Sequence, residues 1–281
     1  MIITNTISDT RKAIAAARSS GKTIGFVPTM GALHAGHYSL VQAAKKECDL
    51  VAVSIFINPT QFGPNEDLAN YPRTFADDCT GCEQNGADIM FVPTPEIMYP
   101  NEKLTWVTVD KLTDNLCGSS RPNHFRGVTT VVTKLFNIIQ PDIAYFGQKD
   151  AQQLSVLEKM VEQLNIPVTI KRCPIVREAD GLAMSSRNEY LSEQEREQAI
   201  CLKDAIDSAC QLFNSGTRNA IEIIDEMNQV ISEYPLARID YISIVDNEFL
   251  QPITQIDKPA LVALAVYMGQ TRLIDNVVLA P

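Results

Sequence analysis

Short apolar runs alternate with helix-like segments up to residue 176, and this alternation constrains the fold more than any other feature. The run LVAVSIFIN, residues 50–58, is continuous and rich in β-branched residues, as expected of a strand buried on both faces. The other strand-like runs are KTIGFVPT (22–29), ADIMFVP (87–93), DIAYFG (142–147) and VTIKRCPIV (168–176). Strands that alternate with helices indicate a parallel sheet with helices on both faces.

The intervening segments have helical patterning. They are RKAIAAARSSG (11–21), HYSLVQAAKKECD (37–49), TFADDCTGCEQNG (74–86), VTTVVTKLFNIIQ (128–140) and KDAQQLSVLEKMVEQLN (149–165). The composition of residues 128–140 suits a strand, but their length and the stop at Pro141 favour a buried helix. The run LTWVTV, residues 104–109, is a candidate edge strand.

The C-terminal part has a different character. Two long polar helices are expected at residues 192–216 and 217–235, followed by strands at 239–246, 260–269 and 271–279. Helices followed by strands predict a smaller α+β domain. The polar segment VREADG, which ends at Gly181, marks the boundary, so we predict domains at residues 1–177 and 178–281.

The composition excludes several classes of protein. A net charge of −10 argues against a general nucleic-acid binder. We expect no membrane span and no signal peptide, because no apolar run is long enough and the N-terminus lacks the required pattern. The seven scattered cysteines indicate free thiols in a reducing cytoplasm. Cys79 and Cys82 form a C-x-x-C pair on a predicted surface helix, for which a redox or zinc role is not favoured.

Two histidines lie where the strand at 22–29 passes into a helix. His34 and His37 belong to the stretch PTMGALHAGH, and ligands of parallel sheets lie beyond such strand ends. Small residues allow close approach, and a helix N-terminus with histidine donors favours phosphate. The sequence therefore predicts a phosphate site. One histidine as a helix cap with the other on the surface is an alternative, and zinc is a weaker one because only His124 remains as a further histidine.

Other polar segments follow the predicted strands. GQKD, residues 147–150, places Lys149 to meet phosphate oxygens, unless it is a solvated loop lysine. MSSR, residues 184–187, combines hydroxyls with a guanidinium and suits polyphosphate, although a helix cap beside a surface arginine would look the same. Gln61 in NPTQF could bind a small polar substrate. The RPNHFRGV loop, which contains His124, is as readily structural as functional.

Several sequence blocks together resemble one family, the pantothenate synthetases (pantoate–β-alanine ligases) of the HxGH nucleotidylyltransferase superfamily. The blocks are PTMGALHAGH, SIFINPTQF, NYPRTFADD, RPNHFRGV, QPDIAYFGQKDAQQL, VREADGLAMSSRNEYL and RLIDN. The resemblance implies an α/β fold with a Rossmann-like N-terminal domain and a smaller C-terminal α+β domain acting as a lid. It also implies a cytoplasmic homodimeric enzyme of pantothenate biosynthesis.

The resemblance implies an AMP-forming ligase that makes a C–N bond. Pantoate would attack the α-phosphate of MgATP to give pantoyl adenylate and pyrophosphate, and β-alanine would then displace AMP to give pantothenate. The expected partners are ATP with Mg²⁺, pantoate and β-alanine, with no nucleic acid and no membrane. A carboxylate is already a nucleophile at neutral pH, so the site needs orientation and charge neutralisation rather than a serine or cysteine.

The resemblance also implies roles for individual residues. His34, His37, Lys149 and Arg187 would be catalytic, with His37 at the family's proton-donor position, and Gln61 and Gln153 would hold pantoate. The ATP-binding residues would be Met30, Gly31, Ala32, Leu33, His34, Ala35, Gly36, His37, Gly147, Gln148, Lys149, Asp150, Val176, Met184, Ser185, Ser186 and Arg187. Metal ligands are not implied. Gln148 departs from the family, which usually has an acid there.

Three other functions compete with this hypothesis. A nucleotidylyltransferase that leaves the nucleotide on its product shares the HxGH motif, and the contexts of Gln61 and Gln153 argue against it. A tRNA synthetase is disfavoured by net charge and length. A non-catalytic nucleotide sensor is disfavoured by the intact His34, His37, Lys149 and Ser185–Arg187.

Overall fold

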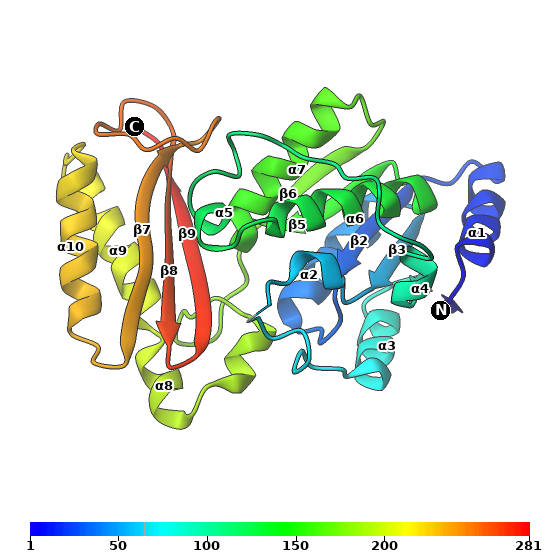
Figure 1. Cartoon of the computed structure of the whole chain (residues 1–281), viewed down its shortest axis with the longest axis horizontal. Coiled ribbons are helices and arrows are strands. Elements are labelled where there is room, and N and C mark those ends of the chain that lie inside the picture. Colours follow the sequence, from blue (N-terminus) through cyan, green and yellow to red (C-terminus); the bar gives the residue numbers. More distant parts are fainter. Residues whose placement is uncertain (65) are drawn as a thin grey trace. The chain divides into compact units, whose positions relative to one another are not determined.

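The computed structural model describes residues 1–64 and 66–281, which form two compact units (Figure 1). The first unit comprises residues 1–109, 121–148 and 156–174, and the second comprises 110–120, 149–155 and 175–281. Two segments from before residue 156 therefore cluster with the C-terminal residues. The domain boundary at residues 177 and 178 stays a prediction.

A six-stranded parallel sheet forms the centre of the first unit, in the order β1-β4-β3-β2-β5-β6. The strands are β1 (Ile2–Thr4), β2 (Ile24–Thr29), β3 (Leu50–Ile55), β4 (Ile89–Phe91), β5 (Ile143–Gly147) and β6 (Thr169–Cys173). Strand β3 is buried along almost its whole length, as its continuous apolar run predicts. The predicted α/β fold class is confirmed.

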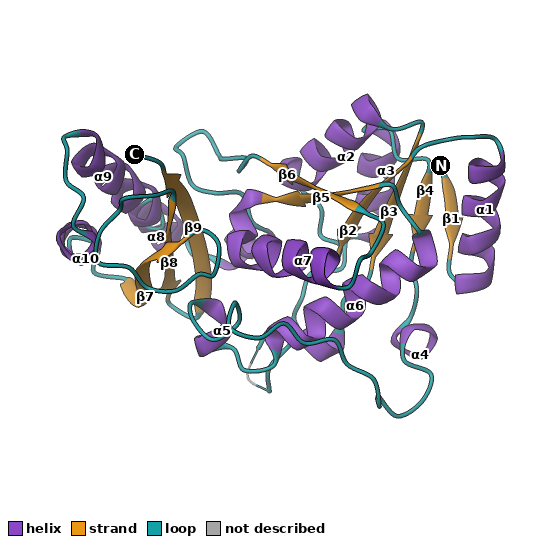
Figure 2. Cartoon of the chain, turned by 90° about the horizontal axis from the view of Figure 1, so that it is seen from above, coloured by secondary structure: helices purple, strands orange, loops and turns teal. Residues whose placement is uncertain are grey.

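Helices cover both faces of this sheet (Figure 2). The helices α2 and α3 lie on one face, and α6 and α7 lie on the other. The bounds are α1 (Ile7–Ser19), α2 (Ala35–Glu47), α3 (Phe75–Gln84), α4 (Pro95–Met98), α6 (His124–Ile139) and α7 (Ala151–Gln163), with 3-10 turns at Pro59–Gln61 and Gln148–Asp150. The strand order reverses between β2 and β5, so this point of the sheet is the expected place for a ligand.

The second unit is a three-stranded antiparallel sheet with helices packed against it. It contains α5 (Cys117–Ser120), a 3-10 turn (Ser186–Tyr190), α8 (Glu193–Gln198), α9 (Cys201–Asn214), α10 (Ala220–Ser232), β7 (Ala237–Asp246), β8 (Ala260–Met268) and β9 (Thr271–Leu279). The helices α9 and α10 lie along the sheet (Figure 1), and their apolar faces share a buried core with β8. The predicted smaller α+β part is confirmed.

Several details differ from the sequence predictions: among them, α4, α5 and the start of α6 at His124 were not predicted. Residues 104–109 are not a strand: the Val107 amide donates to the Thr130 hydroxyl (3.0 Å), and the Val107 carbonyl accepts from the Thr129 hydroxyl (2.7 Å). Hydroxyls of α6 thus satisfy the backbone groups that a sheet would otherwise pair. The single helix predicted at residues 192–216 is two helices, α8 and α9. The short strand β1 was not predicted.

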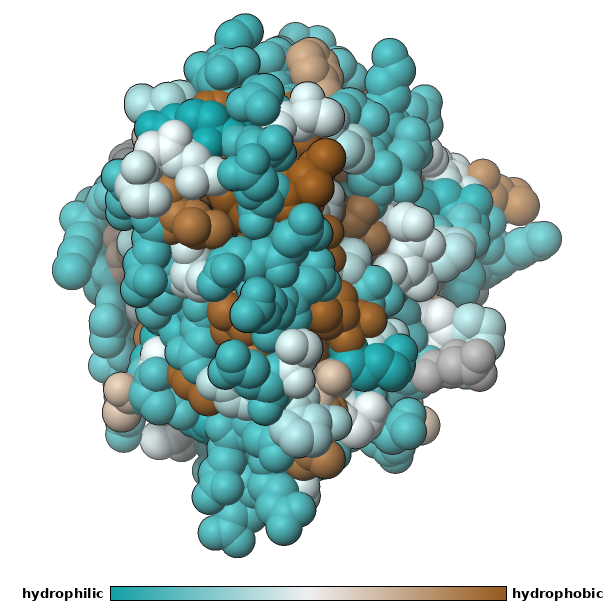
Figure 3. Space-filling model, turned by 90° about the vertical axis from the view of Figure 1, so that its left-hand side faces the viewer, coloured by the Kyte–Doolittle hydropathy of each residue, from teal (hydrophilic) through white to brown (hydrophobic). Residues whose placement is uncertain are grey.

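The outer surface is mainly hydrophilic on the face drawn in Figure 3, where hydrophobic residues form separate patches. Nowhere in residues 1–64 and 66–281 does a helix have the length and apolar character needed to cross a membrane.

Candidate functional site

The candidate site of the first unit lies at the carboxyl ends of β2, β3 and β5. Thr29 at the end of β2 is in register with Ile55 at the end of β3, and β5 pairs in parallel with the other side of β2. Gly147 ends β5, and apart from its two neighbours in the chain, a Cβ atom added there would meet no atom of residues 1–64 and 66–281 within 4 Å. A ligand can therefore approach the Gly147 backbone closely.

The turn after β2 is stabilised by a carboxylate from another helix. Gly31 and Ala32 both have positive φ, at +89° and +51°. The amides of Ala32 and Leu33 donate to the two carboxylate oxygens of Asp78, at 3.0 and 2.8 Å. Asp78 lies on α3 and is only 2% exposed. Asp78 was not among the residues predicted for the site, because its burial and its bonds to the turn appear only in the folded structure.

Both histidines cap helix α2. The Nδ1 atom of His34 accepts from the Gly36 amide (3.1 Å), and the Nδ1 atom of His37 accepts from the His34 amide (3.4 Å). The two rings lie 4.2 Å apart between centroids. A nitrogen that accepts from an amide carries no proton, so each neutral ring has its proton on Nε2.

This capping narrows the reason for expecting phosphate here. The sequence predicts a phosphate site from the helix N-terminus and from histidine donors together, but in the structure the amides of His34 and Gly36 donate to the histidine rings. The Nε2–H groups, which do not take part in the capping bonds, are the donors that suit a phosphate. The capping alternative and the phosphate hypothesis are therefore compatible, since each uses a different ring nitrogen.

Gln61 is held by Asn58, a residue that ends the apolar run of β3 and is 1% exposed. Asn58 Nδ2 donates to Gln61 Oε1 (3.0 Å) and to the Gly127 carbonyl (3.1 Å). Burial raises the pKa of Tyr99, so its hydroxyl stays protonated and donates to Asn58 Oδ1 (2.9 Å). Gln61 Nε2 in turn lies 3.2 Å from the Met30 sulfur, a weak acceptor that a ligand oxygen can replace. The structure thus brings Gln61 and Met30 together, and Asn58 was missed.

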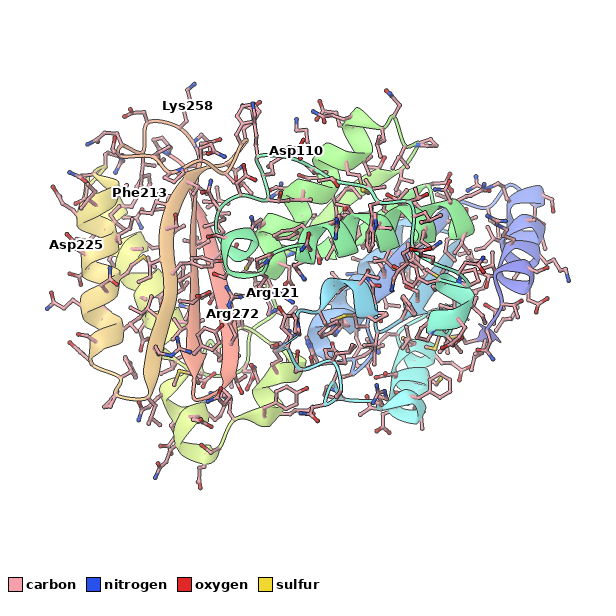
Figure 4. The ribbon with its side chains drawn as sticks, in the orientation of Figure 1. Asp110, Arg121, Phe213, Asp225, Lys258 and Arg272 are labelled. Carbon is pink, nitrogen blue, oxygen red and sulfur yellow. The ribbon has the colours of Figure 1, made fainter. Side chains whose placement is uncertain are left out.

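The third histidine belongs to an ionic cluster with Arg121, which is labelled in Figure 4. His124 Nδ1 lies 2.8 Å from the Gln61 carbonyl, and its Nε2 lies 3.1 Å from Arg121 Nη1. Since a carbonyl only accepts and a guanidinium only donates, His124 is neutral with its proton on Nδ1. Arg121 also donates to both carboxylate oxygens of Glu66, at 2.7 and 2.5 Å.

The pKa of Glu66 reflects two opposed effects. Burial raises it, but the hydrogen bonds and charge of Arg121 outweigh burial and leave the pKa below its ordinary value. Glu66 is therefore ionised at neutral pH and accepts two hydrogen bonds that hold Arg121 in place. Arg121 in turn donates to His124.

The segment after β5 divides between the two units. Gln148 belongs to the first unit, where its Oε1 atom accepts from Arg172 (3.4 Å). Lys149 belongs to the second unit, where its ammonium lies 3.5 Å from Asp150 and its carbonyl accepts from Asn276 (2.9 Å). Gln148, which departs from the family pattern, thus accepts a hydrogen bond from Arg172. Asn276 of β9 holds the backbone of Lys149.

Residues 176–184 form a hairpin of the second unit. The Met184 amide donates to the Val176 carbonyl (3.0 Å), which brings these two predicted site residues together. Arg177 donates to both carboxylate oxygens of Asp275, at 2.6 and 2.9 Å, and to the Gly181 carbonyl. Asp275 is 2% exposed in β9. The RLIDN block therefore supports the hairpin and Lys149, roles that its polar residues in an apolar strand could have indicated.

The remaining predicted site residues have distinct surroundings. Ser185 caps the following 3-10 turn by accepting from the Arg187 amide (3.3 Å), and Ser186 is buried. Arg187 is partly exposed in that turn, and Gln153 is partly exposed in the first turn of α7. The cap alternative for Ser185 is correct, and it leaves the Arg187 guanidinium outside the capping bond.

The histidines, acids and cysteines of the described residues do not gather into a metal centre. Among residues 1–64 and 66–281, no group of three or more His, Cys, Asp or Glu side chains could hold a metal ion. All seven cysteines are free thiols, and burial raises the pKa of Cys82 to about 12. The Cys82 thiol is therefore protonated at neutral pH, which makes it a poor nucleophile.

Comparisons with known proteins agree across the whole length. The family model described as "Pantoate-beta-alanine ligase" matches residues 2–278. A pantothenate synthetase of Thermoanaerobacter sp. (strain X514) is 56% identical over 276 residues, 98% of each chain. The crystal structure of pantothenate synthetase from Thermus thermophilus has a TM-score of 0.95 at 40% identity, covering 100% of both chains. The Francisella tularensis pantoate-beta-alanine ligase, complexed with beta-gamma ATP and beta-alanine, has a TM-score of 0.80 at 34% identity, covering 99% of this chain and 97% of that one.

Proposed function

The chain belongs to the pantoate-beta-alanine ligase family and is a ligase that forms pantothenate, and from this premise we propose how it does so. In the first step a pantoate carboxylate oxygen bonds to the α-phosphorus of ATP, and the bond from that phosphorus to pyrophosphate breaks. In the second step the amine of β-alanine bonds to the acyl carbon, AMP leaves with the C–O electron pair, and the nitrogen loses a proton. The complex named for the Francisella tularensis relative supports ATP and β-alanine as substrates.

ATP binds at the switch point between β2 and β5 in this proposal. The open space at Gly147 supports close approach of the nucleotide to the end of β5. His34 and His37 donate Nε2–H groups to the phosphate oxygens, where negative charge grows as pyrophosphate leaves. A neutral ring with its proton on Nε2 suits hydrogen-bond donation, so we assign His37 charge stabilisation in the first step.

Pantoate is proposed to bind beside the nucleotide through Gln61 and Gln153. The Gln61 amide is preorganised, because Asn58 holds Oε1 and leaves Nε2 against the replaceable Met30 sulfur. An Nε2–H group there can donate to a carboxylate or hydroxyl of pantoate. The carboxylate needs no general base, so orientation is the main contribution of this side of the site.

The other assigned residues are proposed to enclose the phosphates. Lys149 supplies positive charge, and the amide and hydroxyl groups of the segment from Met184 to Arg187 supply further donors. Asp150 and the Val176 backbone complete the nucleotide contacts. This C-terminal segment acts as a lid that keeps water from the adenylate.

Mg²⁺ is proposed to arrive with the ATP phosphates. Mg²⁺ commonly uses few protein ligands and keeps substrate phosphate and water in its shell, which is compatible with the residues described at the switch point. It would neutralise phosphate charge when bound. We name no ligand for it. Homodimer formation and a cytoplasmic location remain part of the proposal.

The observation that carries the proposal is that the Nδ1 atoms of both histidines at the switch point accept from backbone amides, which puts the ring protons on Nε2. The test measures AMP and pyrophosphate released from MgATP with pantoate, with and without β-alanine. Amine-dependent release of AMP with an equal amount of amide product would support the ligase mechanism through an adenylate. Pyrophosphate release with the nucleotide retained on the final product would instead favour a nucleotidylyltransferase, and ATP binding without either product would favour a sensor.

A further inference from the structure

We propose that Asp78 is a positioning residue that sets the direction of the His34 and His37 rings. This inference deepens the proposed function and rests on it for the meaning of the rings. Asp78 reaches the turn from α3, which follows β3, whereas the turn follows β2. Its effect on the histidines is transmitted through the turn between Gly31 and Leu33.

The Asp78 carboxylate accepts hydrogen bonds from three donors. The amides of Ala32 and Leu33 donate to Oδ2 and Oδ1, and the Thr74 hydroxyl donates to Oδ1 at 3.1 Å. Two successive amides directed at one carboxylate form a concave anion site within the chain itself. An ionised acid satisfies this arrangement, whereas a carboxamide would place an NH₂ group against an amide N–H.

The turn needs such a support because its backbone is unusual. Ala32 has φ +51°, a region that non-glycine residues seldom adopt without compensation. A Cβ atom at Gly31 would lie 3.0 Å from the Ile55 side chain and 3.2 Å from Asp78 Oδ2, so the turn packs directly against both. Without the two hydrogen bonds to Asp78, the left-handed backbone conformation of Ala32 is less stabilised.

A change at Ala32 and Leu33 reaches the histidines directly. His34 follows Leu33, caps α2 and supplies the amide to which His37 Nδ1 is bonded. A shift of the turn therefore alters both capping bonds and, with them, the direction of both Nε2–H groups. The carboxylate acts through the backbone and needs no contact with a substrate.

The test compares Asp78→Asn with Asp77→Asn in the full chain. Asp77 is the preceding residue of α3 and is exposed, so its variant removes the same charge from the same helix. We expect Asp78→Asn to lower kcat by about 10- to 100-fold, since small misplacements of a catalytic group have effects of this size. We expect Asp77→Asn to leave kcat within about twofold, as for a surface change.

A spectroscopic readout separates positioning from a general loss of structure. The chain has three histidines, so ¹⁵N imidazole spectra report each ring. In Asp78→Asn the His34 and His37 signals should leave the fixed Nε2–H pattern, while His124 stays unchanged. Equal changes at all three rings, or unchanged His34 and His37 signals with kcat within twofold, would overturn the proposal.

The test remains decisive in two cases, when Asp78→Asn does not fold and when the wild-type chain is inactive. If Asp78→Asn does not fold, Thr74→Val removes one donor to Asp78 and should lower kcat by about threefold, with a smaller shift of the same two rings. No change in either quantity would also overturn the proposal. If the wild-type chain releases no AMP, the proposed function fails, but the imidazole spectra still decide whether Asp78 positions the histidines.

Discussion

Two regions of the first unit use histidine in opposite ways. At the turn after β2, the Nδ1 atoms of His34 and His37 accept from backbone amides, so their protons lie on Nε2. At the start of α6, His124 Nδ1 donates to the Gln61 carbonyl, so its Nε2 is an acceptor for Arg121. The same residue type thus carries its proton on Nε2 in one region and bridges two groups of the protein in the other.

This difference shows that the backbone group facing Nδ1 sets the role of each ring. An amide fixes the Nε2–H form, and a carbonyl fixes the Nδ1–H form. Amide side chains can imitate one nitrogen at a time: asparagine reaches about as far as Nδ1, and glutamine reaches about as far as Nε2. The two regions should therefore tolerate opposite substitutions.

The largest expected effect is at His37. His37→Ala and His37→Asn should lower kcat about 100- to 1,000-fold, the size found when a donor to developing negative charge is removed. His37→Gln keeps a donor near the Nε2 position and should retain more activity than either. AMP release measures the rate, and thermal unfolding checks that each variant is folded.

Two outcomes at His37 would contradict the role assigned to its Nε2 atom. If His37→Asn is as active as His37→Gln, Nε2 is not the acting atom. A wild-type rate in His37→Ala would remove the phosphate role altogether.

His124 should show the reverse preference with a smaller effect. His124→Asn can still donate to the Gln61 carbonyl, so the KM for pantoate should stay within about twofold. His124→Gln loses that donor, and the KM should rise about 5- to 10-fold, equivalent to one hydrogen bond. Steady-state kinetics with varied pantoate measure both values. A larger effect for asparagine than for glutamine would show that the assigned tautomer is wrong.

The acid dependence of stability should follow the Arg121–Glu66 pair. The pKa of Glu66 is lowered in the folded chain, so the stabilisation is complete above the unfolded value of about 4.3 and disappears as the pH falls through the folded value. At pH 7 we expect Glu66→Gln to lower the free energy of unfolding by about 1–2 kcal/mol.

Urea unfolding of wild type and Glu66→Gln across a pH series tests this sign. The difference between the two proteins should shrink as the solution becomes more acidic. A difference that grows on acidification would mean that Glu66 is not ionised in the folded chain. Asp77→Asn, an exposed change on α3, serves as the matched loss of one negative charge.

The smallest expected effect is at Gln148, near the switch point but bonded to Arg172. The Glu158 carboxylate already accepts two hydrogen bonds from Arg172, at 2.7 and 2.5 Å. Restoring the usual family acid with Gln148→Glu should therefore add only a weak ion pair and change kcat by less than about threefold. A gain above tenfold in AMP release would show instead that this carboxylate takes part in the chemistry.

Local patterns of the sequence determined the layers of the first unit and the position of the candidate site on its sheet. The alternation of apolar runs and helices predicts the parallel sheet, because each run must bury its own side chains. The same patterns place Gly147 at the end of one strand and His34 and His37 after another, and the carboxyl ends of these strands share an edge. Residues 104–109 were one exception, since their strand-like composition did not reveal that α6 hydroxyls satisfy the backbone of Val107.

Tertiary structure alone decided which groups hold the site in place. Asp78 bonds to Leu33 across 45 residues, and Asn58 bonds to Gly127 across 69. The tautomer of His124 follows from a bond of the same kind, to the Gln61 carbonyl, whereas those of His34 and His37 follow from local capping bonds. The long-range bonds join single polar groups at unrelated positions and leave no period in the sequence, whereas apolar burial repeats along every strand and helix. The burial of apolar side chains, which repeats along each strand and helix, could thus be predicted from the sequence. The individual hydrogen bonds could be identified only in the folded structure.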